Sequence, residues 1–230
     1  MDIYWQGLVE AARLLFSGDR EVMEVISRTL HVSGTATMIS VLIGLPLGTF
    51  LALASFPGRR FIVSVVNFGM GLPPVVVGLG VWLALARYGP LGFLGLLYSP
   101  TAMITAQVVI ASPIVTGFAI AAIQSLNPKI RLQILALGAT RLQLLRLLLR
   151  EARLGLLAAV IAGFGGAISE VGASMMVGGN LEGSTRVLTT AIVMEVGKGE
   201  WEIAAALSVI LLVLAFGITA VLTTAQQRGR

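Results

Sequence analysis

The residues that could do chemistry in this chain are few and scattered. Cysteine is absent and His31 is the one histidine among 230 residues. Disulfides, thiolate metal sites and a cysteine nucleophile are therefore excluded. His31 has no acidic residue at ligand spacing, which favours an interfacial histidine over a metal ligand. The chain also lacks a GxxxxGK[ST] motif, the pattern of a phosphate-binding loop. We predict no cofactor, no metal and no enzymatic activity.

Glu170 is the one acidic side chain that falls inside an expected membrane span. An ionisable group there costs about 2.5–3.5 kcal/mol on insertion scales, so it usually faces protein or water. One interpretation places Glu170 at a gate or pathway, where it holds a neighbouring segment in one state. The alternative is a carboxylate near the outer interface that accepts backbone hydrogen bonds.

The segment 128–153 concentrates basic residues on what reads as two short helices. Ile130, Ile134 and Leu137 recur at i, i+4 and i+7, which places them on one helical face. Gly138 is a natural helix stop, because glycine tolerates the left-handed conformation. A second helix is expected to start at Arg141 and to run into the next span. Such a helix can lie on anionic lipid or can dock into a groove of a partner protein.

The hydropathy of the chain indicates that Glu170 and the basic segment 128–153 are positioned by transmembrane helices. Apolar residues make up 57% of the chain and charged residues 12%, about half of what a soluble domain usually carries. Residues 29–58, 61–86, 88–128 and 203–227 contain no charged side chain. A spanning helix needs about 20 mostly apolar residues. The sequence therefore predicts an all-α integral membrane protein of about five transmembrane helices.

The five expected spans differ in regularity. We place them at 29–55, 61–86, 101–127, 154–176 and 203–224. Two prolines, Pro73 and Pro74, predict that the second span is broken. Ser112-Pro113 predicts an interruption of the third span. We expect residues 1–28 to form an amphipathic extracytoplasmic or interfacial lead-in, 29–225 the transmembrane domain and 226–230 a polar cytoplasmic tail.

The distribution of positive charge predicts the orientation. With a cytoplasmic C-terminus, the inner segments 56–60, 128–153 and 225–230 hold ten Lys or Arg against one acid, Glu151. Lys and Arg are enriched in cytoplasmic loops, so we expect the N-terminus on the outer side of the membrane and the C-terminus in the cytoplasm. The membrane is expected to be the cell membrane, or the inner membrane of a cell that has two. The net charge of +5 is thereby explained without nucleic acid, and no interleaved basic and aromatic pattern indicates such a partner.

Three stretches resemble the permease subunits of ABC importers for molybdate, sulfate and tungstate. Residues 136–141 (ALGATR) are similar to the centre of the family's cytoplasmic loop, although the leading Glu-Ala-Ala of that loop falls on residues 132–134 (LQI). Residues 72–78 (LPPVVVG) resemble the family's proline-rich span. Residues 167–173 (AISEVGA), with the continuation to 180 and the later TRVLTTAI, look most like the tungstate branch.

The resemblance implies a fold, partners and site residues. It implies the type I ABC importer permease architecture working as a homodimer in membrane lipid. A cytoplasmic ABC ATPase dimer and an extracytoplasmic substrate-binding protein would complete the importer. The implied substrate is an oxyanion, tungstate or molybdate, with a sulfate permease and a stand-alone secondary transporter as alternatives. The ATPase-coupling residues would be Ile130, Ile134, Leu137, Gly138, Ala139, Thr140 and Arg141, and the pathway or gate residues Pro73, Pro74, Ser169, Glu170 and Gly172.

Overall fold

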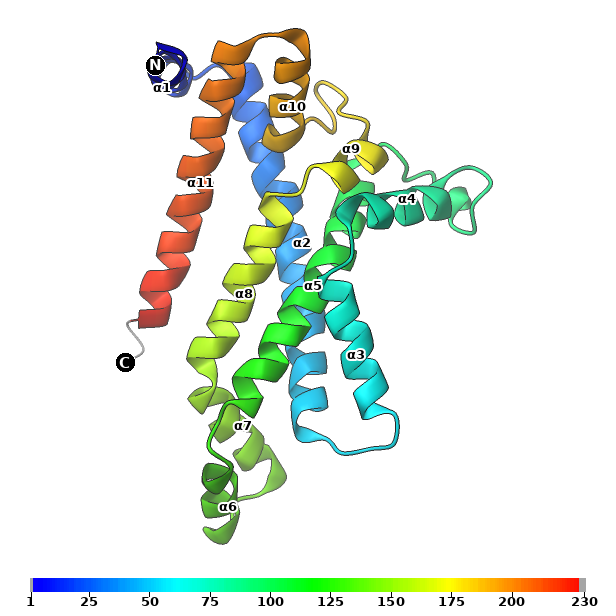
Figure 1. Ribbon diagram of the computed structural model, residues 1–230, viewed down its shortest axis with the longest axis vertical. Coiled ribbons are helices and arrows are strands. Elements are labelled where there is room, and N and C mark those ends of the chain that lie inside the picture. The colour runs from blue at the N-terminus through cyan, green and yellow to red at the C-terminus, as the bar shows by residue number, and fades with distance from the viewer. Residues whose placement is uncertain (1, 228–230) are drawn as a thin grey trace.

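The long axis of the molecule is set by a bundle of helices that run side by side. The computed structural model describes residues 2–227, without the side chains of residues 2–4 and 225, and that part of the chain contains helices and no strands. Three helices are long and apolar enough to cross a membrane: α2 (Arg20–Leu53), α5 (Pro100–Gln124) and α11 (Trp201–Gln227). Figure 1 shows all three along the long axis.

Two further spans are bent pairs of helices. The first pair, α3 (Arg59–Met70) and α4 (Pro74–Leu85), is bent by 102°, and the second, α8 (Arg153–Ile168) and α9 (Gly172–Gly178), by 55°. In Figure 1, α4 lies across the bundle while α3 runs along it. If each pair is one span, the described residues give the five spans that the sequence predicted, and the break at the two prolines is confirmed.

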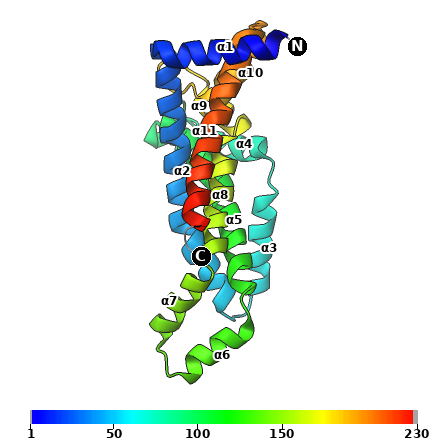
Figure 2. The ribbon, with the colours of Figure 1, turned by 90° about the vertical axis from the view of Figure 1, so that its left-hand side faces the viewer.

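Short helices cover the two ends of the bundle. Helix α1 (Asp2–Ser17) lies across the end of the bundle where α10 (Leu188–Lys198) also lies (Figure 2), and it packs against α11. The opposite end carries α6 (Pro128–Ala136) and α7 (Arg141–Glu151). A short 3₁₀ turn, η1 (Gly92–Leu94), lies in the loop between α4 and α5.

Close packing between α2 and α5 depends on glycine. A Cβ added at Gly44 would lie 2.8 Å from Cβ of Val115, and one added at Gly48 would lie 2.7 Å from Cβ of Ala119. Small residues four apart let two helix backbones approach closely in lipid. The structure thus identifies α5 as the close neighbour of this face of α2.

Two sequence-based expectations were wrong for identifiable reasons: where the first long helix begins, and whether the third span is interrupted. Helix α2 begins at Arg20 rather than at residue 29, because the Asp19 side chain accepts a hydrogen bond from the Val22 amide at 3.0 Å and caps the helix there. The limit expected between residues 28 and 29 therefore falls inside a helix. The third span is not interrupted at Pro113, since α5 continues through it. Proline is tolerated inside membrane helices that are packed among neighbours, and α5 packs against both α2 and α8.

The fourth span was expected as one helix over 154–176, but the chain turns after Ile168 and starts α9 at Gly172. The second loop helix stops at Glu151, and only Ala152 separates α7 from α8. At the far end, α11 continues to Gln227, so the expected tail begins as helix and its last three residues, 228–230, lie outside the described residues.

Candidate functional site

Glu170 lies in the turn between α8 and α9, where it organises the bend. Its side chain is buried, with 6% of the residue exposed. The Ala173 amide donates a hydrogen bond to Glu170 Oε1 at 2.8 Å, which caps the first turn of α9. The Thr189 hydroxyl donates to the Glu170 carbonyl at 2.9 Å and so ties the bend to α10. The carboxylate therefore accepts a backbone hydrogen bond and fixes the direction of α9.

Helix α9 rests directly on the crosswise helix α4. A Cβ added at Gly78 of α4 would lie 2.6 Å from Cα of Ala173, and one added at Gly172 would lie 2.8 Å from Cγ2 of Val75. Neither glycine can carry a side chain without moving one helix from the other. The bend between Met70 and Pro74 and the bend at Glu170 therefore place α4 and α9 in one packed unit. We call this unit the α4–α9 layer (residues 74–85 and 172–178).

A buried amide anchors this layer to α5. Gln107 is almost fully buried, and its Nε2 donates a hydrogen bond to the hydroxyl of Ser174 at 3.3 Å. The Oε1 atom of Gln107 has no partner among the described residues. The sequence analysis did not single out Gln107. The signal that could have identified it was a long polar side chain within an otherwise apolar run of residues.

Ser169 points elsewhere. Its hydroxyl donates to the carbonyl of Gly165 at 2.7 Å within its own helix, and the residue is exposed at the end of α8. Pro73 and Pro74 are exposed as well. The structure thus places Gly172 against α4 and Glu170 at the start of α9, and leaves Ser169 and the two prolines exposed.

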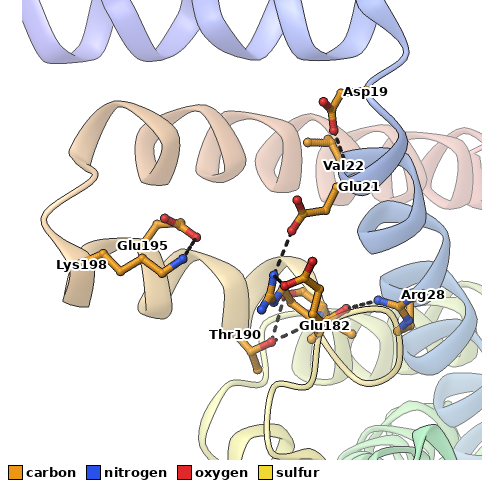
Figure 3. A network of polar contacts seen from close by, with 10 residues as sticks. Asp19, Glu21, Val22, Arg28, Glu182, Thr190, Glu195 and Lys198 are labelled. Atoms are coloured by element: carbon orange, nitrogen blue, oxygen red, sulfur yellow. Dashed lines mark hydrogen bonds and ion pairs between the residues drawn. The ribbon is translucent and has the colours of Figure 1, made fainter.

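A second polar cluster, residues 20–28 of α2 with 182–186, joins elements that are far apart in the sequence. Nη1 of Arg186 lies 2.9 Å from Glu21 Oε1 and 3.5 Å from Glu182 Oε2. Nη1 of Arg28 donates to the Arg186 carbonyl at 2.9 Å. Figure 3 shows Glu21, Glu182 and Arg28 converging between α2 and the loop that precedes α10. Sequence reasoning missed this cluster, because pairing across such a separation leaves no periodic signal.

The loop 128–153 folds as predicted into two helices around Gly138. Gly138 has φ +77°, in the left-handed region, and no neighbouring atom lies within 4 Å of an added Cβ. Helix α7 then starts with a capping box: the Gln143 amide donates to Thr140 Oγ1 at 3.3 Å, and the Thr140 amide donates to Gln143 Oε1 at 2.8 Å. The sharp turn is therefore defined by local chemistry.

The faces of α6 differ in their surroundings. Ile130 and Ile134 are half-buried and line a hollow of about 430 Å³ together with Leu147 of α7. Leu137 is 87% exposed and Leu132, on another face of α6, is 66% exposed. Ala139 is half-buried in the turn, and Arg141 is exposed at the edge of an apolar groove formed with α2. The open apolar surface of this loop is thus carried by leucines.

Within residues 2–227, no three His, Asp or Glu side chains come together as a metal site would require. The glutamate at the bend and the charged cluster of Figure 3 are held by hydrogen bonds and ion pairs. What the arrangement can do is hold two bent spans in one packed state and present a defined loop at one end.

Comparison with known proteins gives these features a family context. Residues 44–228 match the model of the family described as binding-protein-dependent transport system inner membrane component. The tungstate uptake system permease protein TupB of Peptoclostridium acidaminophilum is 40% identical over 99% of this chain and 100% of its own length. That of Campylobacter jejuni is 36% identical over 94% and 90%. A solved MetNI methionine ABC transporter shares the fold, with TM-score 0.74 and 21% identity over 95% of this chain and 98% of its own.

Proposed function

The chain belongs to the family of binding-protein-dependent transport system inner membrane components, and from this premise we propose that it carries tungstate through the membrane as the permease subunit of an ATP-driven importer. The observation that carries the substrate assignment is the similarity to two tungstate uptake permeases over almost the whole chain. The fold is that of a type I ABC importer permease, as the sequence predicted.

The distribution of acidic residues fits an anion as cargo. Residues 25–150 contain no Asp or Glu. This stretch holds most of α2, the bent pair α3–α4, the whole of α5 and the part of the loop that precedes Glu151. Its charged side chains are all Lys or Arg, and therefore positive. Clefts lined by one sign of charge raise the local concentration of the opposite ion. A pathway built from these segments would therefore favour an oxyanion over a cation.

The loop 128–153 is the segment that we assign to the cytoplasmic ATPase. Its support is local: a defined turn at Gly138 and two exposed leucines, Leu132 and Leu137. Exposed apolar side chains on a short helix suit a groove in a partner protein. This assignment places the N-terminus outside the cell and the C-terminus in the cytoplasm. The opposite end, with α1, α10 and the charged cluster, would then face the substrate-binding protein.

Two copies of the chain would enclose the pathway between them. We assign Pro73, Pro74, Ser169, Glu170 and Gly172 to the pathway or its gate, because they flank the two bends that form the α4–α9 layer. Glu170 acts there by fixing α9, not by touching the anion. Closure of the ATPase dimer on ATP would move the loop and, through α7 and α8, the bend at Glu170.

Uptake competition tests the substrate. Cells that express this chain with its ATPase and binding protein are supplied with tungstate, and metal content is measured by mass spectrometry with molybdate or sulfate in excess. We expect tungstate uptake that molybdate reduces in part and sulfate leaves unchanged. Uptake of sulfate or molybdate in preference to tungstate would contradict the substrate assignment and leave the permease role intact.

Co-purification tests the ATPase contact. Leu137→Asp places a charge on the exposed end of α6 and should abolish retention of the ATPase subunit on the tagged permease. The conservative Leu137→Met keeps the side chain apolar and should retain it. Equal retention by both variants would show that the ATPase binds elsewhere.

A further inference from the structure

Helix α3 has three faces, and one of them suits neither lipid nor packing. The packed face meets α5 and includes the buried Val66, and a Cβ added at Gly69 on this side would lie 2.8 Å from Cβ of Pro113. A second face exposes large apolar side chains, with Phe61, Val65 and Phe68 at helical spacing. This second face fits the acyl chains of a bilayer.

The third face is polar and exposed. Arg60, Ser64, Asn67 and Gly71 follow one another at intervals of four, three and four residues, so they share one side of α3. All four are exposed. An asparagine at membrane depth is costly unless its amide finds a partner. The Asn67 side chain makes no hydrogen bond with the residues that the structure describes, whereas the Ser64 hydroxyl donates to the Arg60 carbonyl at 3.0 Å.

The two arginines at the start of α3 have different surroundings. Arg59 is half-buried, and its Nε donates to the Leu51 carbonyl at the end of α2. Arg60 is exposed, and its guanidinium makes no ion pair or hydrogen bond with the residues that the structure describes. Arg59 is thus a structural link between helices. Arg60 is available at the same end of the polar face.

A second, independent observation points to water at the other end of this face. Helix α3 stops at Met70, and the chain turns by 102° into α4. Pro74 has no amide hydrogen to donate to the Met70 carbonyl. Irregular backbone at membrane depth is tolerated where it is buried in protein or lines a water-filled cavity. Gly71, at the end of the polar face, belongs to this irregular backbone and is exposed.

We propose that the polar face of α3, Arg60–Ser64–Asn67–Gly71, lines the aqueous pathway between the cytoplasm and the break at Pro73, with the Asn67 amide donating hydrogen bonds to a passing tetrahedral oxyanion. This proposal rests on the proposed function. An asparagine offers two N–H donors and no charge, which allows contact without tight retention. Arg60 supplies positive charge at the cytoplasmic mouth, and no carboxylate lies within residues 25–150 to oppose it.

Cysteine accessibility tests the proposal, because the natural chain has no cysteine. Asn67→Cys and Ser64→Cys probe the polar face, and Val65→Cys probes the neighbouring apolar face of the same helix. The full importer complex is treated in membranes with a sulfonate-bearing methanethiosulfonate, which is an impermeant anion. We expect residues 64 and 67 to react faster than residue 65 by about an order of magnitude or more, since thiols in apolar surroundings form little thiolate. Modification at residue 67 should also block tungstate uptake, whereas Val65→Cys should remain active after treatment.

Two results would overturn the proposal. Equal, slow reaction at residues 64, 65 and 67, with and without ATP, would show that the polar face meets no water. Rapid oxidation of Asn67→Cys to a disulfide between two copies, without reaction with the sulfonate, would make this face a subunit contact. In either case the unsubstituted complex would still take up tungstate, so the proposed function would stand. Loss of tungstate uptake by the unsubstituted complex itself would contradict the proposed function instead.

Discussion

Substitution of Gly78 tests whether α4 and α9 form one packed layer. In Gly78→Ala, the added methyl group would lie 2.6 Å from Cα of Ala173, a backbone atom that cannot rotate away. Helix α4 would have to separate from α9. Gly80 provides the control, because it belongs to the same helix and an added Cβ there meets nothing within 4 Å.

The two substitutions should change stability in opposite directions. Gly80→Ala restricts the unfolded chain and should stabilise the protein by about 0.4–1 kcal/mol. Gly78→Ala has the same benefit but adds overpacking, which costs about 1–3 kcal/mol. The difference between the variants is therefore about 1–3 kcal/mol. For a chain of this size, each kcal/mol shifts Tm by about 2–4 °C, so we expect a gap of about 2–12 °C.

Thermal unfolding of the purified permease in detergent, followed by tryptophan fluorescence, measures this gap. Tungstate uptake provides the functional readout, and we expect Gly80→Ala to retain it while Gly78→Ala lowers it. Identical melting temperatures for the two alanine variants would refute the reasoning, because the contact between Gly78 and Ala173 would then carry no steric constraint.

Three further substitutions test the remaining contacts. Glu170→Ala removes the acceptor of the Ala173 amide and should lower the free energy of unfolding by about 0.5–2 kcal/mol, whereas Glu170→Gln, which keeps an oxygen, should cost less in the same melting assay. Arg186→Met breaks two ion pairs with exposed carboxylates and should change that free energy by less than about 1 kcal/mol. Gly138→Val forces a branched residue to φ +77°, at a cost of about 1–2 kcal/mol, and should weaken co-purification of the ATPase. Gly138→Asn tolerates this conformation and should retain the ATPase. An equal loss of ATPase from both variants would show that the added side chain, rather than the backbone conformation, disturbs the contact.

The sequence predicted those parts of the fold that depend on local chemistry. Long uncharged runs predicted the spans, because the bilayer requires them. Pro73 and Pro74 predicted the broken span, and Gly138 predicted the turn of the loop. Each of these signals acts through a residue's own backbone preferences or its transfer into lipid, so no knowledge of neighbours was needed.

The sequence did not predict features that depend on partners far along the chain. Pro113 reads as an interruption, yet α5 continues because neighbouring helices surround it. Glu170 was singled out as the one acid within an expected span, but its partner, the Ala173 amide, is evident only once the bend is known. Asn67 was not noticed, because one polar residue in an apolar run has meaning only when the three faces of α3 are distinguished.

Uptake into proteoliposomes tests the central claim most directly. The purified chain is reconstituted alone, with the ATPase subunit, or with the ATPase and the substrate-binding protein, and tungstate accumulation is measured with and without ATP. We expect accumulation only in the complete system with ATP. Accumulation or equilibration of tungstate by the chain alone would contradict the account, because the chain would then be a channel or a secondary transporter.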